Sequence, residues 1–99
     1  MDKNEFRDDV KNLIKVCTIE VQHRKTGING ESTIEQLENT ILPELNQLFT
    51  KVDNNQLPPL SERYLLSFAN AFKVWGWDMN QPTEIFVKLA DINNNYSKI

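Results

Sequence analysis

Residues 6–21, FRDDVKNLIKVCTIEV, carry the clearest structural signal in the chain. Their apolar side chains recur three and four positions apart, the spacing that places them on one face of an α-helix. Gly27 follows a few residues later, at a point where a left-handed residue commonly ends a helix. The pattern predicts an amphipathic helix over residues 2–25 whose inner face carries Phe6, Val10, Leu13, Ile14, Cys17 and Val21.

The segment after Gly27 predicts a second helix that contains a proline. Ser32 and Glu35 have the spacing of a capping box at its start. Pro43 lies inside the apolar stripe, where it removes a backbone donor and crowds the preceding turn. Because the stripe keeps its phase across Pro43, we expect a kinked but continuous helix. The stripe consists of Ile34, Leu37, Ile41, Leu45, Leu48 and Val52.

Two more helices are predicted on either side of Gly76. Ser61 is placed as the N-cap of the third helix. Because this helix has the densest aromatic face, we expect it to lie at the centre of the core. Pro82 fits the first turn of the fourth helix. The predicted inner faces are Tyr64, Leu65, Phe68, Ala69, Phe72 and Trp75 in the third helix, and Ile85, Phe86, Leu89, Ile92 and Tyr96 in the fourth.

These four segments predict one all-α domain over residues 1–99. No segment alternates apolar and polar residues as a β-strand does. Short connections between amphipathic helices favour antiparallel neighbours. We therefore expect an up-down antiparallel four-helix bundle with a proline-kinked second helix.

Composition narrows the class of protein further. The chain is 39% hydrophobic and 25% charged, as globular domains are. It has no apolar run near the roughly 20 residues of a transmembrane helix and no secretory signal, so we expect no membrane insertion. Its single cysteine, Cys17, fits a reducing cytoplasm. The net charge of −3, with scattered Lys and Arg, argues against a nucleic-acid partner.

Few residues are suited to catalysis. His23 is the only histidine, so one chain offers no histidine pair for a metal or for proton transfer. Cys17 lies on the apolar face of the first helix, where burial makes a thiol a poor nucleophile. The glycines lack the pattern of a phosphate-binding loop. We expect no metal site, no cofactor and no enzymatic activity.

One acidic residue lies in an apolar stripe. Glu38 follows Ile34 by about one turn, and a buried carboxylate is costly unless it is paired. Glu20 and Arg24 of the first helix would lie at the same end of the bundle. The three side chains predict either an ion-pair cluster that closes this end or a polar pocket for a small ligand.

Apolar residues on the outer helix faces predict a partner surface. Such residues lie on the outer faces of the first and third helices. Val87 lies on the outer face of the fourth. Trp77, which follows Gly76, either folds back as a lid over the end of the bundle or projects as an interface anchor. The second alternative is considered because tryptophan is enriched in binding hot spots. The candidate partner surface consists of Val16, Ile19, Leu66, Val74, Trp77 and Met79.

Together these observations favour a small cytoplasmic, non-catalytic domain that binds another protein. In size, acidity and helix content the chain resembles the small four-helix bacterial immunity proteins that protect bacteriocin producers. The resemblance implies an immunity-type or antitoxin-type inhibitor of another protein. Two alternatives remain: a self-associating structural or scaffold subunit whose outer strips meet their own copies, and a small-ligand sensor built on Glu20, Arg24 and Glu38.

Overall fold

The computed structural model describes residues 1–99, and every regular element in it is helical. The elements are α1 (Lys3–Lys25), α2 (Ile34–Gln36), the π-helical turn η1 (Leu37–Ile41), α3 (Leu42–Asp53), the 3₁₀ turn η2 (Leu60–Glu62), α4 (Leu66–Lys73) and α5 (Glu84–Tyr96). Since α2, η1 and α3 follow one another without a break, the fold is compatible with a four-helix bundle. The predicted all-α class is confirmed, while the up-down arrangement and the proline kink stay predictions.

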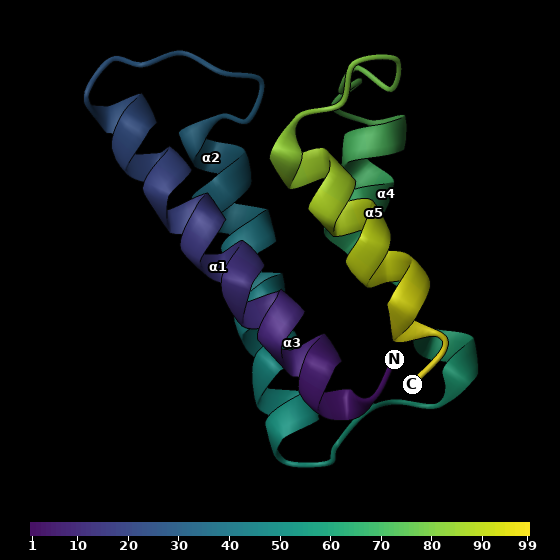
Figure 1. The fold of residues 1–99 in the computed structure, drawn as a ribbon. Coiled ribbons are helices and arrows are strands. Elements are labelled where there is room, and N and C mark those ends of the chain that lie inside the picture. The colour runs from purple at the N-terminus through teal and green to yellow at the C-terminus, as the bar shows by residue number, and fades with distance from the viewer.

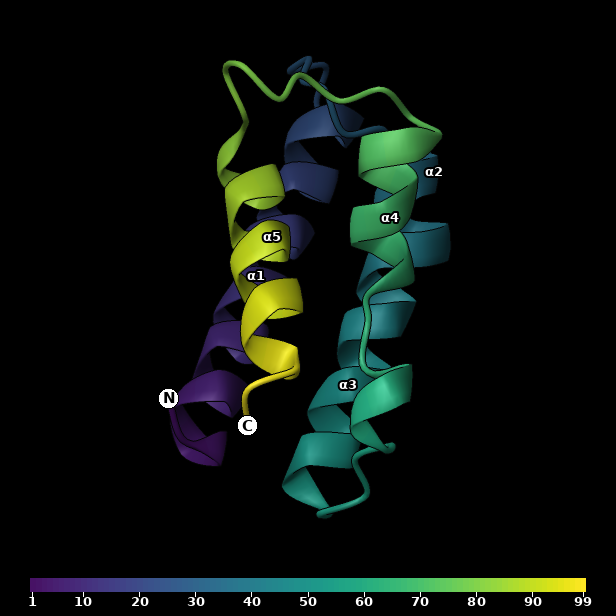
Figure 2. The same cartoon turned by 90° about the vertical axis from the view of Figure 1, so that its right-hand side faces the viewer.

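The helices form two layers. Figure 1 shows α1 beside the α2–α3 segment, and α4 with α5 on the other side of the molecule. In the turned view of Figure 2, α5 lies over α1, and α4 lies over the α2–α3 segment. The longest helix, α1, packs against both α3 and α5, whereas α4 packs mainly against α5. None of these helices has the length and apolarity needed to cross a membrane.

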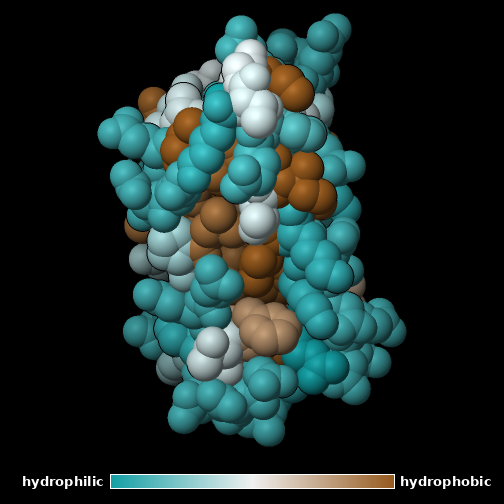
Figure 3. Space-filling model, turned by 90° about the vertical axis from the view of Figure 1, so that its left-hand side faces the viewer, coloured by the Kyte–Doolittle hydropathy of each residue, from teal (hydrophilic) through white to brown (hydrophobic).

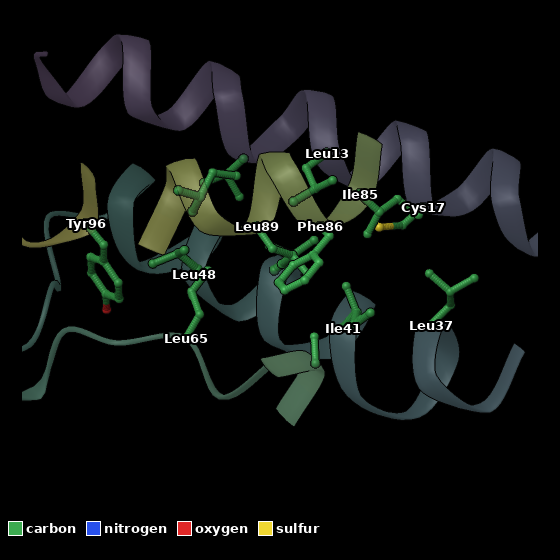
Figure 4. Packing of buried hydrophobic residues seen from close by; sticks show 14 of the residues in the cluster. Leu13, Cys17, Leu37, Ile41, Leu48, Leu65, Ile85, Phe86, Leu89 and Tyr96 are labelled. Atoms are coloured by element: carbon green, nitrogen blue, oxygen red, sulfur yellow. The ribbon is translucent and has the colours of Figure 1, made fainter. Parts of the chain in front are cut away.

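The core lies between α1, the α2–α3 segment and α5. Figure 4 shows Leu13 and Cys17 of α1 pointing toward Leu37 and Ile41 on the opposite side of the core. The inner faces predicted for the first and last helices are confirmed, except that Ile14 is only partly buried. The buried apolar residues of these three parts are Phe6, Val10, Leu13, Cys17 and Val21; Leu37, Ile41, Leu45, Leu48 and Val52; and Ile85, Phe86, Leu89, Ile92 and Tyr96.

The capping box of the second helix is real but begins one residue later than predicted. Thr33 Oγ1 accepts a hydrogen bond from Gln36 N at 3.0 Å, and Gln36 Oε1 accepts one from Thr33 N at 3.1 Å. Ser32, the predicted cap, is buried instead, and its carbonyl accepts from Arg24 Nε at 2.7 Å. The Ser32 carbonyl thus helps Arg24 to hold the preceding loop. Thr33, the next residue, is the N-cap.

A π-helical turn precedes Pro43. In η1 the Leu42 N–H donates to the Leu37 carbonyl, five residues back rather than four. An α-helical turn here would push the proline ring against the Asn39 carbonyl, which has no N–H of residue 43 to pair with. The π-helical turn η1 ends two residues before Pro43. Single π-turns of this kind occur inside α-helices. The predicted continuity of the helix is therefore confirmed.

The third predicted helix begins later than expected. Ser61 lies in η2, and α4 starts only at Leu66. The residue before it, Leu65, has no capping side chain of its own. The carboxylate of Glu44 on α3 accepts from Leu66 N at 2.6 Å and from Ser67 N at 2.8 Å. The predicted N-cap at Ser61 is wrong because a side chain from another helix caps α4.

The inner face of α4 also differs from the prediction. Ser67 and Ala71 are fully buried, whereas Tyr64 and Phe72 are exposed, Phe72 to 44%. Small residues on the buried side let α4 approach the rest of the molecule closely. This rotates the larger rings of α4 outward or to its edge, so the predicted placement of Tyr64 and Phe72 in the core is wrong. The core centre lies on the other helices instead.

The connection from α4 to α5 folds over the end of the core. Gly76, with a φ of 66°, turns the chain so that Trp77 N donates to the Ala71 carbonyl at 3.1 Å. The Trp77 ring meets Phe86 edge-on, with centroids 5.7 Å apart. The start of α5 is capped by Thr83. Pro82 therefore precedes the helix, and the prediction that it lies in the first turn is wrong.

Candidate functional site

An apolar groove lies between α4 and α5. It has a volume of about 260 Å³ and is closed at one end by the connection between the two helices. Phe72, Met79 and Val87 are among the exposed large apolar residues of the chain, and all three line it. The full lining is Phe68, Phe72, Met79, Pro82, Phe86, Val87, Ala90 and Asp91.

Two aromatic rings form a ridge along the groove. Phe68 packs on Phe86 of α5, with centroids 5.8 Å apart, and so is fixed against the core. Phe72 lies 6.3 Å from Phe68 and is supported by it. A shallow hollow of about 280 Å³, lined in part by Tyr64 and Lys73, also includes both phenylalanines. The ridge therefore presents apolar rings to two neighbouring depressions, a shape suited to a side chain from another protein.

The predicted partner residues do not form one surface. Met79 lies in the α4–α5 groove. Leu66 is exposed but lines a different cavity, next to Glu44. Ile19 on α1 and Val74 after α4 are exposed as predicted, and neither lines any of the larger hollows described here.

Two of the predicted partner residues are not exposed. Trp77 is only 4% exposed, so it is the lid over the end of the core and not an interface anchor. Val16 is partly buried and packs against the core beside Glu20. The assignment of Trp77 to a partner surface is therefore wrong, because the connection from α4 to α5 folds it back onto Phe86. The assignment of Val16 stays a prediction.

Sequence reasoning missed Phe72, which is central to the groove. It was assigned to the core because aromatic residues dominate one side of the α4 segment. The signal that identifies the buried side is the pair of small residues, Ser67 and Ala71, four positions apart. Such a pair marks the side on which a short helix approaches its neighbours.

The polar cluster at the loop end of α1 is an ion-pair network. Arg24 Nη2 lies 2.7 Å from Glu20 Oε2, and His23 Nδ1 lies 3.2 Å from Glu20 Oε1. Glu38 is outside this network, since it is exposed and pairs with Lys25 at 3.5 Å. The predicted contact of Glu38 with the other two residues is therefore wrong, although the ion-pair interpretation of Glu20 and Arg24 is confirmed.

The Arg24 guanidinium also fixes the loop that follows α1. Besides Glu20, it bonds the Ser32 carbonyl, and Gly30 packs so closely on it that a Cβ at residue 30 would overlap the guanidinium. A cavity of about 220 Å³ remains beside these groups. Because its central cation is already paired and hydrogen bonded, the cluster serves the loop structure.

Cys17 is fully buried in the core. Burial, and to a lesser degree the charge of Glu20, raise the pKa of its thiol to about 12. A thiol with this pKa is protonated at physiological pH and is a poor nucleophile. Its position therefore supports a packing role.

We expect the raised pKa of Cys17 to make the protein less stable at high pH. The unfolded thiol ionises near pH 9 and the folded thiol only near pH 12, so between these values the unfolded state binds fewer protons. Stability is therefore fully present below pH 9 and falls as the pH rises toward 12. Urea denaturation of the wild type and of Cys17→Ala across this range measures the effect. The wild type should lose stability more steeply, and equal slopes would contradict the prediction.

The face of the molecule formed by α1 and α3 also shows an apolar strip. Figure 3 shows a column of hydrophobic atoms on the side of α1 and α3, bordered by hydrophilic atoms on both sides. Ile14, Leu42 and Phe49 of these helices are partly buried and pack against the core. Since these side chains are largely engaged with the core, the α4–α5 groove, with Phe72, Met79 and Val87 exposed, is the better candidate site.

Comparisons of the chain with protein-family models, with curated proteins and with solved structures give no match.

Proposed function

We propose that the chain is a non-catalytic, cytoplasmic protein-binding domain that uses the α4–α5 groove to hold another protein. The observation that carries this proposal is the exposure of Phe72, Met79 and Val87 along one groove. Contiguous exposed apolar surface of this kind commonly marks an interaction site. Aromatic residues backed by a rigid core are also the usual energetic centres of protein interfaces.

The specific form we propose is an inhibitor of the immunity or antitoxin type, which acts by stoichiometric binding. Such a role needs a preformed surface and no reactive group. Cys17 is buried and His23 is engaged with Glu20, which supports a non-catalytic role. The single cysteine without a disulfide partner supports the cytoplasmic location.

The test is affinity capture from the cells that naturally produce the chain, with matched variants. Phe72→Asp places a charge in the groove at an exposed position and should leave the fold intact. Val74→Asp is the control, because Val74 is 72% exposed and lies outside the groove. We expect a partner that is retained by the wild type and by Val74→Asp but lost with Phe72→Asp. Buried aromatic anchors typically contribute at least about 2 kcal/mol to binding, so the loss should exceed about twentyfold in affinity.

Light scattering over a concentration range separates this proposal from self-association. A monomer at all concentrations is expected. A dimer that Phe72→Asp dissociates would assign the groove to a second copy of the chain. A partner that binds the Phe72→Asp variant as tightly as the wild type would place the interface elsewhere.

A further inference from the structure

A separate cavity of about 350 Å³ lies between α3, the segment that leads from η2 into α4, and the end of α5. Figure 2 shows the turn that follows α3 running back beside the C-terminal half of α3. Residues of both segments line the cavity. Leu48, Leu65 and Tyr96 line it and are buried, so part of its wall is apolar. Its volume lies in the range of pockets that hold small molecules.

The Tyr96 hydroxyl is free to bond a ligand in this cavity. Tyr96 is only 5% exposed, and its ring stacks on Phe6 with centroids 5.7 Å apart. Figure 4 shows the hydroxyl pointing away from α5, toward the side on which Leu65 lies. None of the chain's hydrogen bonds involves this hydroxyl, and its oxygen is not among the fully buried unpartnered atoms, so it is accessible from the cavity that Tyr96 lines. Burial raises the pKa of the Tyr96 phenol above its usual range, so the hydroxyl is neutral at physiological pH.

The charges around the cavity favour a cation. Glu44 and Glu62 supply two carboxylates and Lys51 supplies one ammonium, which leaves the lining with a net charge of −1. Neither Glu62 nor Lys51 belongs to any of the chain's ion pairs, and the whole chain carries a net charge of −3. Tyr64 also lines the cavity and is exposed, and the face of a tyrosine ring attracts cations.

We propose that this cavity binds a small organic cation, a primary ammonium on an apolar stem. The ammonium lies against the Glu62 carboxylate and the Tyr96 hydroxyl, and the stem packs on Leu48 and Leu65. The site is distinct from the α4–α5 groove and does not depend on the function proposed for that groove. The cation is either a free amine or the side chain of a lysine in another protein, which share this chemistry.

Three probes with the same apolar body test the proposal: 3-methylbutylamine, 3-methylbutanol and 4-methylpentanoate. Each is titrated into the ¹⁵N-labelled protein while the amide resonances of Leu66 and Ser67, which bond Glu44, are followed by NMR. The amine should shift these resonances, the alcohol should bind at least about tenfold more weakly, and the carboxylate should not bind. Equal binding of the amine and the alcohol, or no shift with the amine at millimolar concentration, would overturn the proposal.

Three variants test the assigned contacts. Tyr96→Phe removes only the hydroxyl, and Glu62→Gln removes only a charge, so each should weaken amine binding about five- to tenfold. Lys51→Met removes the competing cation and should tighten binding a few-fold. Val74→Ala, remote from the cavity, is the control. Unchanged amine affinity in both Tyr96→Phe and Glu62→Gln, with the rest of the spectrum intact, would contradict the site.

The two sources of the cation are separated with Nα-acetyl-lysine methylamide. If this compound binds as tightly as the free amine, the cavity accepts a lysine side chain of a protein. If it binds much more weakly, the cavity is shaped for a free amine. Both results keep the ammonium chemistry of the site, which the three matched probes test.

Discussion

Replacing Phe6 with alanine is expected to lower the free energy of unfolding by about 3–5 kcal/mol. Phe6 is fully buried and stacks on Tyr96, so its ring joins the beginning of α1 to the end of α5. Removal of the ring forfeits its burial and leaves a cavity that the surrounding helices fill only in part. Since a domain of this size has a total stability of about 5–15 kcal/mol, this loss is a large fraction of the whole.

Urea denaturation of Phe6→Ala and the wild type measures this effect. Ile19→Ala is the matched control, because Ile19 lies on the same helix but is exposed. Its effect should stay within about 0.5 kcal/mol. A loss of less than about 1 kcal/mol in Phe6→Ala would show that the ends of α1 and α5 are not packed together as described.

Replacing Glu44 with alanine is expected to cost about 2–3 kcal/mol and to loosen α4 selectively. The Glu44 carboxylate takes the first two N–H groups of α4, and hydrogen bonds to a charged group contribute about 1.5–3 kcal/mol each. Two bonds at the lower end of this range give about 3 kcal/mol, and solvent exposure of Leu66 N reduces the expected loss further. Without the carboxylate, these N–H groups have no capping side chain, since Leu65 supplies none.

Hydrogen exchange resolves the effect by residue. The amides of Leu66–Lys73 should exchange faster in Glu44→Ala, while those of α1 change little. Glu44→Gln retains one acceptor oxygen and should recover about half of the loss. Gln47→Ala is the control, because Gln47 lies on the same helix and its side chain makes no hydrogen bond. Uniform acceleration across all helices would show that Glu44 acts on global stability and not as the cap of α4.

The helices with the strongest local patterns were predictable. The inner faces of α1 and α5 carry apolar residues at helical spacing, and nearly all of these are buried. Gly27, with a φ of 92°, follows α1 as its sequence position indicates. In these segments the periodicity alone determines which side faces the core.

The start and the orientation of α4 were not predictable, because both depend on distant residues. Its cap comes from Glu44, 22 positions before Leu66, and Leu65 N donates to Asn93 Oδ1 on α5. Its buried side carries Ser67 and Ala71, whereas a hydrophobic pattern favours the phenylalanines for the core. The same error concealed the groove, since Phe72 is its most central residue.

The candidate site was predicted only in part. Met79 was included as the neighbour of Trp77 in a candidate interface anchor, and it lies in the groove. Trp77 was included because tryptophan is enriched in binding hot spots, but it packs on Phe86 and is buried. A pattern along the chain does not distinguish a tryptophan that projects from one that folds back, because the difference depends on the path of the connection.

The remote caps of α4 bear on the order in which the protein is expected to fold. An eight-residue helix is not stable by itself in water, and α4 takes its capping groups from α3 and α5. We therefore expect α4 to form after those helices have paired, with φ-values near zero for substitutions in it. Since the α4–α5 groove needs α4 in place, a chain whose core had formed without α4 would lack the surface that we propose for a partner.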